Sequence, residues 1–389
     1  MLLALLFIGI FGLLTSTVFA GMVLAGARHH LRRRDAGSRE TEFTPQLSLL
    51  KPLHGSEPDL EANLSTFFEQ DYPDYEILFC AADELDAGLE IARHAAAHYP
   101  QIQTRFFFTG EPKYINAKVH SLEVMTSAAQ HDLLVISDSD VRVSRDYLRA
   151  VAAPFTDAKT GAMTCLYRGV AVEGGLWARL EAVGMSVEMT AGVLVANMLE
   201  GMQFVLGPTM AVRRECVDHM GGIGVLGEYC SDDYLLGNYV FQQGRRVVLS
   251  HHVIDHMILN SGFAGSIKHQ VRWMKSTRFS RPKGHFGTAL TFSMPFGLLA
   301  LGATVALHRP ILGAALFAWS VVTRWAIAWA AGRRVVHDPD WFGLYVLFPV
   351  RDLMGFCFWA ASYFSSKIVW RGKLYKLLPG GRMRAVGRD

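Results

Sequence analysis

Cysteine is scarce in this 389-residue chain, and charged side chains are few. The cysteines are scattered and show no CxxC spacing, so the sequence predicts reduced thiols in a cytosol-facing protein rather than a disulfide framework or a zinc site. Charged residues make up 19% of the chain and the net charge is +3, so nothing in the charge favours nucleic acid as a partner. The sequence contains no P-loop pattern, so it does not indicate an NTPase. The five cysteines are Cys80, Cys165, Cys216, Cys230 and Cys357.

Apolar residues are abundant, at 51%, and one long run opens the chain. Residues 1–27 are almost wholly apolar and long enough to cross a bilayer. Val18-Phe19-Ala20 before Gly21 resembles a signal-peptide cleavage site. We favour an uncleaved anchor, because no charge precedes the run and the run continues past that site. The positive-inside rule then places the basic and polar linker 28–45, together with the domain after it, in the cytoplasm.

The last third of the chain, residues 287–366, is expected to be a membrane region. Residues 287–307 and 311–331 are each long enough to span. The third apolar stretch, 341–364, contains Arg351-Asp352, and the tail 367–389 is basic. Four full spans would put that tail outside, against the positive-inside rule. We therefore expect that the third stretch does not cross fully and that a re-entrant or interfacial element keeps the tail cytoplasmic, with a third full span as the alternative. Arg324 and the Arg351-Asp352 pair are functional candidates at membrane depth, with a structural ion pair as the alternative.

The middle of the chain, residues 46–255, alternates short apolar runs with helical patterns. This order predicts an α/β fold, a mostly parallel sheet covered by helices. Within it, the Met-rich helical stretch 176–200 is read either as core or as a surface that touches lipid. Residues 256–286 are expected to be an amphipathic interfacial region. The apolar runs are 47–50, 75–80, 104–108 and 133–136, and the helical patterns between them are 59–69, 85–98 and 116–129.

The most informative stretch is HDLLVISDSDVRV, from His131 to Val143. Its apolar run ends in Asp138-Ser139-Asp140, and in an extended segment residues i and i+2 point the same way. Two carboxylates at the end of a buried strand suit Mg²⁺ or Mn²⁺ at the edge where open α/β sheets bind ligands. A polar strand end that caps a turn is the alternative. Asp232-Asp233 at a helix start has the same ambiguity between capping and chemistry.

The spacing of His269, Arg272 and Trp273 puts these three side chains on one face of a helix. The neighbourhood is basic, which favours either an interfacial helix attracted to anionic lipid or a clamp for a diphosphate. The two interpretations are compatible.

Taken together, these residues resemble a known family. Asp83, Asp138-Ser139-Asp140, Asp233 and Arg272-Trp273 look like the D, D, D, (Q/R)xxRW set of membrane glycosyltransferases with a GT-A fold. The stretches 51–55 and 63–73 are similar to the opening of ceramide glucosyltransferases, glycosyltransferase family twenty-one. The stretches 164–169 and 174–177 look most like the bacterial hopanoid-associated branch. One departure is His269 at the first position of the motif, with glutamine displaced to Gln270.

The resemblance implies a role for each aspartate of the set. Asp83 takes the uracil or the ribose of a nucleotide sugar, and Lys118 helps to hold the nucleotide. Asp138 and Asp140 hold the ribose side and a divalent metal, Mg or Mn. Asp233 is the general base that removes the proton from the acceptor hydroxyl.

The resemblance also implies roles for the later basic helix. His269 and Arg272 contribute to nucleotide-sugar binding, and Arg272, with Trp273 packed beneath it, stabilises the leaving diphosphate.

We therefore expect an integral membrane glycosyltransferase that inverts the anomeric centre, in the bacterial inner membrane with its catalytic domain facing the cytoplasm. Its partners are a UDP-sugar, a lipid acceptor and the bilayer, with no nucleic acid. The donor and acceptor pair is UDP-N-acetylglucosamine with a hopanoid polyol, or UDP-glucose with ceramide. The main alternative is a processive polysaccharide synthase of the same superfamily. A transporter or receptor, and a catalytically dead sugar-binding relative, are weaker alternatives.

Overall fold

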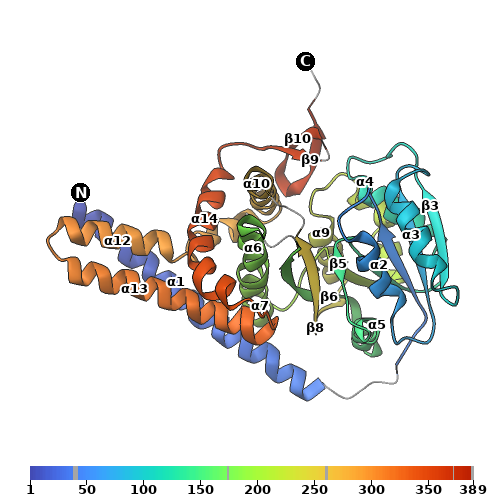
Figure 1. Ribbon diagram of the computed structural model, residues 1–389, viewed down its shortest axis with the longest axis horizontal. Helices are drawn as coiled ribbons and strands as arrows, with labels where there is room; N and C mark the ends of the chain where they lie inside the picture. The colour runs from blue at the N-terminus through green and yellow to red at the C-terminus, as the bar shows by residue number, and fades with distance from the viewer. Residues whose placement is uncertain (38–42, 173–174, 259–261, 371, 387–389) are drawn as a thin grey trace. The chain divides into compact units, whose positions relative to one another are not determined.

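The computed structural model describes residues 1–37, 43–172, 175–258, 262–370 and 372–386. The chain forms two compact units (Figure 1). The sheet unit comprises Gly37–Tyr167, Glu200–Leu259 and Gly381–Asp389, and the helical unit comprises Met1–Ala36, Arg168–Leu199 and Asn260–Gly380. The observed sheet unit differs in one respect from the expected catalytic domain 46–255, because residues 168–199 belong to the helical unit.

The sheet unit is built on one mixed sheet of eight strands in the order β3-β2-β1-β4-β7-β6-β8-β5. The strands β3, β2, β1 and β4 are parallel to one another, whereas β4 pairs antiparallel with β7. The α/β fold class is confirmed. The strands are β1 (Leu47–Pro52), β2 (Tyr75–Ala81), β3 (Gln103–Phe108), β4 (Leu133–Ser137), β5 (Val141–Arg142), β6 (Thr160–Ala171), β7 (Thr209–Arg213) and β8 (Arg246–Ile258), with a short β11 (Met383–Ala385).

The central strand β4 is buried along its whole length, as its continuous apolar run predicts. Leu50 of β1 pairs with Ile136, and Ser137 pairs with Thr209 of β7. The ends of β1 and β4 and the start of β7 therefore meet at one edge of the sheet. The helices of this unit are α2 (Leu60–Phe68), α3 (Ala87–Ala97), α4 (Ala117–Ala128), α5 (Tyr147–Ala152), α8 (Arg214–His219) and α9 (Asp232–Gln242), with 3-10 turns η1 (Ala153–Thr156) and η3 (Ile223–Leu226).

A glycine sets the position of α9, the helix that begins with Asp232 and Asp233. A Cβ on Gly237 would lie 2.5 Å from backbone atoms of Phe204, closer than real side chains approach. Only glycine lets the helix pack directly on that loop.

The helical unit begins with α1 (Leu2–Gly37), whose helix continues ten residues beyond the expected end of the anchor at residue 27. Among the residues that the structure describes, four helices are long and apolar enough to cross a membrane: Leu2–Arg32, Leu176–Leu199, Pro310–Val335 and Gly343–Ala361. The remaining elements are α6 (Leu176–Val183), α7 (Thr190–Leu199), α10 (Phe263–Ser280), α11 (Pro282–Thr288), α12 (Met294–Ala306), α13 (Pro310–Ile327), α14 (Phe348–Ala361), π-helical segments η2 (Gly184–Met189), η4 (Ala328–Val335) and η5 (Gly343–Leu347), the hairpin strands β9 (Lys367–Trp370) and β10 (Lys373–Leu377), and η6 (Pro379–Gly381).

The expected span 287–307 is not one helix. It divides into the end of α11 and the 13-residue α12, which at 1.5 Å per residue covers about 20 Å, less than the hydrocarbon core. Asp352 explains the break, because its Oδ2 accepts hydrogen bonds from the backbone N–H groups of Ser293 (2.9 Å) and Met294 (2.8 Å). This carboxylate caps the start of α12.

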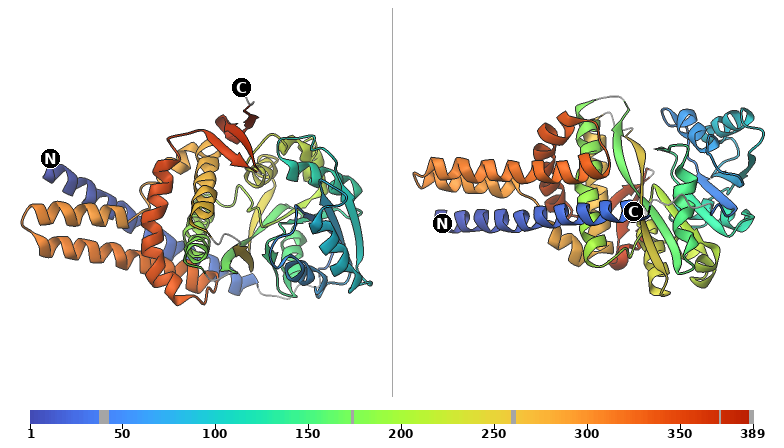
Figure 2. Two further views of the ribbon diagram at one scale, coloured as in Figure 1. Left: turned by 45° about the horizontal axis from the view of Figure 1, so that its top comes forward. Right: turned by 90° about the horizontal axis from the view of Figure 1, so that it is seen from below.

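Close packing holds the apolar helices together. α12 and α13 run side by side (Figures 1 and 2), and Gly297 and Gly313 leave room for side chains of the opposite helix. In α1, a Cβ on Gly9 would lie 3.0 Å from Ala300, and Ser16 Oγ donates to Ser293 Oγ at 3.2 Å. Small residues at such contacts let helices approach closely in lipid.

The buried charged residues of the apolar helices do not form the Arg351–Asp352 ion pair that their adjacent positions suggest. Arg351 and Asp352 are neighbours on one helix but do not pair with each other. Arg324 Nη1 lies 2.7 Å from Asp352 Oδ1, and Arg351 Nη2 lies 3.0 Å from Glu188 Oε2. Consecutive helical residues point about 100° apart, so each reaches a different helix.

We predict that Gly237→Ala destabilises the sheet unit, because overpacking of this kind costs about 1–3 kcal/mol. The melting temperature of the detergent-solubilised protein should fall by several degrees. Gly192→Ala is the matched control, since a Cβ there meets nothing within 4 Å. Equal melting temperatures for the two variants would refute the close-approach argument.

Candidate active site

Two carboxylates and a lysine meet where β4 ends. Lys118, in the first turn of α4, places its Nζ 2.5 Å from Asp138 Oδ1 and 3.9 Å from Asp232 Oδ2. Burial alone would lower the pKa of Lys118, but these two carboxylates raise it above its ordinary value. Asn116 caps α4 through its side-chain oxygen, and its Nδ2 donates to Asp232 Oδ1 at 3.3 Å. The start of α4 therefore organises both acids.

Asp233 lies beside this group, in the first turn of α9. Its Oδ2 accepts the Gly207 N–H at 3.1 Å and its Oδ1 accepts the Tyr234 N–H at 2.7 Å. Burial and the adjacent Asp232 raise the pKa of Asp233 to about 6. A carboxylate tuned toward neutral pH suits a general base.

Gly207 lies between the two acidic groups. A Cβ there would be 3.4 Å from Asp233 Oδ2 and 3.7 Å from Asp138 Oδ2. A methyl group at this position would therefore fit between the two carboxylates at ordinary van der Waals distances and would occupy the space that separates them.

Asp140 fits a divalent cation. Its Oδ1 is buried, with no hydrogen-bond partner among the described residues, and its Oδ2 lies 3.7 Å from His256 Nε2. Such orphaned atoms are rare in native proteins unless a ligand or ion satisfies them. Carboxylate oxygens with an imidazole are donors that Mn²⁺ and Mg²⁺ accept. The carboxylate of Asp140, with His256 beside it, therefore fits such a metal, whereas Asp138 Oδ1 contacts Lys118.

The geometry around these two aspartates differs from the extended segment expected. Residues 139 and 140 form a turn, so Asp138 and Asp140 reach different partners. Glu57 bonds to the middle of this turn, accepting from Ser139 Oγ at 2.8 Å. This hydrogen bond stabilises the turn, in which the neighbouring carboxylates repel one another.

Sequence reasoning missed three side chains that shape this group. They are Lys51, Tyr167 and His256. Lys51 is fully buried, and its Nζ donates to the Asp138 carbonyl oxygen at 2.5 Å. Burial lowers the pKa of Lys51 to about 7, although nearby carboxylates oppose the shift. The ring of Tyr167 lies 5.5 Å from that of His256, and burial and the surrounding aspartates raise the pKa of Tyr167 well above its ordinary value. Lys51 and Tyr167 lie in stretches that carry the family resemblance, but that resemblance assigned them no role. His256 reaches the site through sheet register, by its pairing with Val141.

Asp83 follows β2 at the same edge of the sheet but is exposed, and its Oδ1 accepts the Leu85 N–H at 2.9 Å. The carboxylate thus stabilises the turn that follows β2.

The predicted residues His269, Arg272 and Trp273 lie on α10, in the helical unit. His269 and Trp273 pack ring to ring, with centroids 4.3 Å apart. The Arg272 guanidinium lies 6.0 Å from the ring centroid of Trp370 on β9. The expectation that Trp273 packs beneath Arg272 therefore needs correction, because residues i and i+1 on a helix do not face each other.

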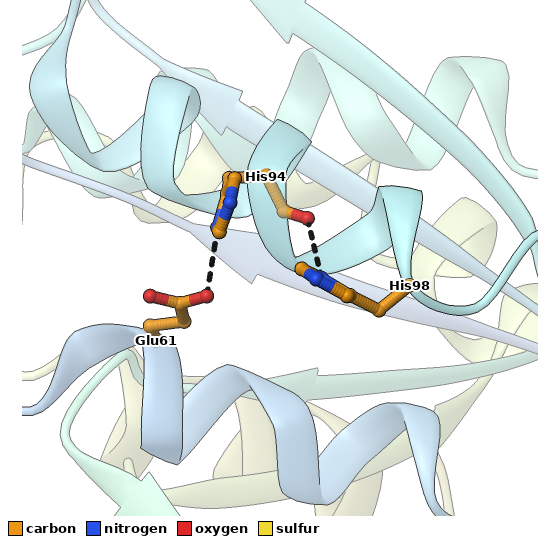
Figure 3. A group of neighbouring side chains, drawn as sticks. All are labelled: Glu61, His94 and His98. Carbon is orange, nitrogen blue, oxygen red and sulfur yellow. Dashed lines mark hydrogen bonds and ion pairs between the residues drawn. The ribbon is translucent and has the colours of Figure 1, made fainter.

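Two other groups of side chains in the described part of the chain could mark a binding site. A shallow pocket in the sheet unit is lined by Leu133 and Arg213, at the end of β4 opposite to Asp138. Glu61, His94 and His98 gather at the surface of α2 and α3 (Figure 3). All three are exposed, and His94 Nδ1 lies 2.8 Å from Glu61 Oε1, so a surface ion pair accounts for them.

The chain has a fold of the GT-A type. The solved structure of a mannosyltransferase from Pyrobaculum calidifontis, in complex with GDP-Man and Mn²⁺, superimposes with a TM-score of 0.51 at 17% identity, covering 92% of this chain and 98% of that one. At that identity the likeness concerns the fold.

Sequence comparison then gives the family. The model of glycosyl transferase family 21 matches residues 13–383, and the chain belongs to this family. Two similar proteins from Caenorhabditis elegans are ceramide glucosyltransferase 1, 26% identical over 87% of this chain and 73% of its own, and ceramide glucosyltransferase 3, 24% identical over 89% and 75%. The predictions of family, GT-A fold and enzyme class are confirmed.

We predict that Gly207→Ala removes activity without removing stability. The added methyl group meets Asp138 and Asp233 at ordinary van der Waals distances, so the fold should tolerate it, but it occupies the gap between them. Transfer should fall roughly tenfold or more, as misplacement of reacting groups does, with an unchanged melting temperature. A fully active Gly207→Ala variant would show that substrate does not enter this gap.

Proposed function

We propose that this glycosyltransferase moves a sugar from a UDP-sugar to the hydroxyl of a ceramide-like membrane lipid. The observation that carries the proposal is the similarity of most of the chain to proteins named ceramide glucosyltransferases. The helices long enough to span a bilayer are consistent with an acceptor drawn from it. A hopanoid polyol with UDP-N-acetylglucosamine is the second candidate, favoured by the resemblance of residues 164–177.

The proposed reaction is a single displacement. The acceptor oxygen attacks the anomeric carbon while the bond from that carbon to the diphosphate breaks. Asp233 takes the hydroxyl proton, and UDP leaves with the electron pair of the broken bond. One displacement inverts the anomeric centre, so an α-linked donor gives a β-glycoside.

The donor is held by both charge and shape. Asp138 and Asp140, with His256, would hold Mg²⁺ or Mn²⁺, which when bound neutralises charge on the departing diphosphate. Lys118 keeps Asp138 in place and adds positive charge. Asp83 is proposed to contact the uracil or the ribose.

The helical unit supplies the remaining proposed contacts. Arg272 stabilises the leaving diphosphate and His269 assists it, while Trp273 supports the His269 ring. We further propose that the protein resides in the bacterial inner membrane with the sheet unit in the cytoplasm, where nucleotide sugars are made.

The deciding experiment is a transfer assay on purified, detergent-solubilised protein. UDP-glucose and UDP-N-acetylglucosamine are offered separately, each with ceramide and with a hopanoid polyol, and products are identified by mass spectrometry. Glucosylceramide supports the proposal, and a hexosaminyl hopanoid replaces the acceptor. Products that carry chains of several sugars would favour a processive synthase instead.

We predict that Asp233→Asn lowers the transfer rate by about 10²–10⁴-fold, the usual contribution of a general base, while UDP affinity changes little. Titration calorimetry with UDP and the transfer assay measure the two quantities. Asp218→Asn, at an exposed position in the same unit, is the matched control. Near-normal transfer by Asp233→Asn would assign the base to another residue.

We predict that Asp140→Ala weakens the effect of metal on nucleotide binding. Raising Mn²⁺ should tighten UDP binding to the unaltered protein, and Asp140→Ala should need about tenfold or more Mn²⁺ for the same effect, as loss of a ligand-shell contact does. Asp218→Ala should behave as the unaltered protein does. Identical Mn²⁺ titrations for all three proteins would remove Asp140 from the metal site.

A further inference from the structure

The strands β9 and β10, which follow α14, form a hairpin whose two faces differ. On one face Ile368, Tyr375 and Leu377 are buried, and α10 packs against both strands (Figure 1). Lys275 of α10 ties the helix to the hairpin, because its Nζ donates to the Lys367 carbonyl oxygen at 2.8 Å. The side chains of the opposite face are exposed.

The exposed face pairs like with like. Val369 lies directly opposite Leu374, and Lys367 lies directly opposite Lys376. Val369 is 63% exposed and Leu374 is 39% exposed, so an apolar pair faces outward beside two ammonium groups. Like charges directly opposite each other destabilise an antiparallel pair, and a two-stranded hairpin is only marginally stable in water. A negatively charged group between the lysines would remove their repulsion.

The protein's own carboxylates do not supply that negative charge. In the described part of the chain, Lys367, Lys376, Lys275 and Arg278 form no ion pair with Asp or Glu. The sequence gives the reason, because residues 256–337 and 353–388 contain no acidic residue. Lys275 and Arg278 are three positions apart on α10 and share a face of that helix. The hairpin and this turn of α10 therefore form one cationic surface.

The hairpin lies within a short reach of a helix that is able to cross a bilayer. The helix Gly343–Ala361 is long and apolar enough to do so, and β9 begins at Lys367. Residues 362–366 connect the two, and a chain of this length spans at most about 20 Å. Tyr363 and Phe364 of this connection are exposed, Phe364 to 88%. Aromatic side chains, tyrosine in particular, gather at the membrane–water interface.

We propose that the hairpin docks its exposed face on a bilayer that contains anionic phospholipids. Lipid phosphate groups contact Lys367 and Lys376 and remove their mutual repulsion, while the apolar pair enters the boundary between headgroups and acyl chains. A lipid surface fits this face better than a soluble anion does, because a soluble anion would leave Val369 and Leu374 in water. The proposal goes beyond the transfer reaction and holds whichever sugar and acceptor the protein uses.

Hydrogen–deuterium exchange of the full-length protein tests the proposal. The protein is reconstituted in nanodiscs of phosphatidylcholine alone, or of phosphatidylcholine with phosphatidylglycerol, and amide exchange is followed in peptides that contain β9 and β10. Docking stabilises the hairpin against local opening, so exchange should be severalfold slower in the nanodiscs that contain phosphatidylglycerol. Equal exchange in the two lipids would overturn the proposal.

The double variant Lys367→Gln with Lys376→Gln tests the charges. Each basic residue near an anionic surface contributes about fivefold to binding, so losing both should weaken docking roughly 25-fold and abolish the difference between the two lipids. Lys159→Gln, at an exposed position in the sheet unit, is the matched control and should keep the difference. A difference that survives in the double variant would remove these lysines from the docking surface.

The double variant Val369→Ser with Leu374→Ser tests the apolar pair. It should weaken docking by about tenfold or more, because less apolar surface leaves water, and the difference between the two lipids should shrink accordingly. An unchanged difference would show that the pair stays outside the lipid. Exchange in peptides of the sheet unit is recorded for every variant, so that a folding defect is recognised by faster exchange there as well.

Two further measurements on the unaltered protein identify the partner without any substitution. At about 1 M salt the Debye length falls to about 3 Å, so the difference between the two lipids should disappear, and a difference that persists would contradict the role of charge. UDP or inorganic phosphate added to the phosphatidylcholine nanodiscs should leave hairpin exchange unchanged. If either slowed exchange as much as phosphatidylglycerol does, the surface would be a site for a soluble anion and the proposal would be wrong.

Discussion

Repulsion between like charges is the constraint on which the active site depends. Asp138, Asp140, Asp232 and Asp233 are brought together by the ends of β4 and α9, and carboxylates this close favour shared or displaced protons. Lys118 offsets part of the charge, and Lys51 contributes from a fully buried position beside the Asp138 carbonyl. The remaining negative charge suits a divalent cation.

The helical unit handles charge in the opposite way. Its buried arginines and acids are matched in pairs, Arg324 with Asp352 and Arg351 with Glu188. Paired charges hold helices at defined positions without leaving a net charge among apolar side chains. The unit thus supplies a rigid support for α10, while the sheet unit keeps the unbalanced charge that chemistry needs.

Sequence patterns predicted the parts of this protein that depend on local periodicity. The apolar run before Asp138 identified β4, and the helical spacing of His269 and Trp273 matches their ring contact. Sequence patterns did not predict the features that depend on contacts between segments far apart in the chain. His256 and Tyr167 reach the site only through antiparallel register, and Asp352 breaks the expected span 287–307 from more than fifty residues away. The partner of Arg272, Trp370, lies in a tail that composition alone described as basic.

The contact between Ser16 and Ser293 joins segments 277 residues apart in the chain. At ribosomal speeds of about 5–20 residues per second, roughly 14–55 s pass between the synthesis of α1 and that of its packing partner α12. During that interval the part of α1 that packs on α12 lacks its partner, and lipid can cover the apolar side chains there. Its uninterrupted apolar run is therefore a requirement of the order of synthesis as much as of the finished structure.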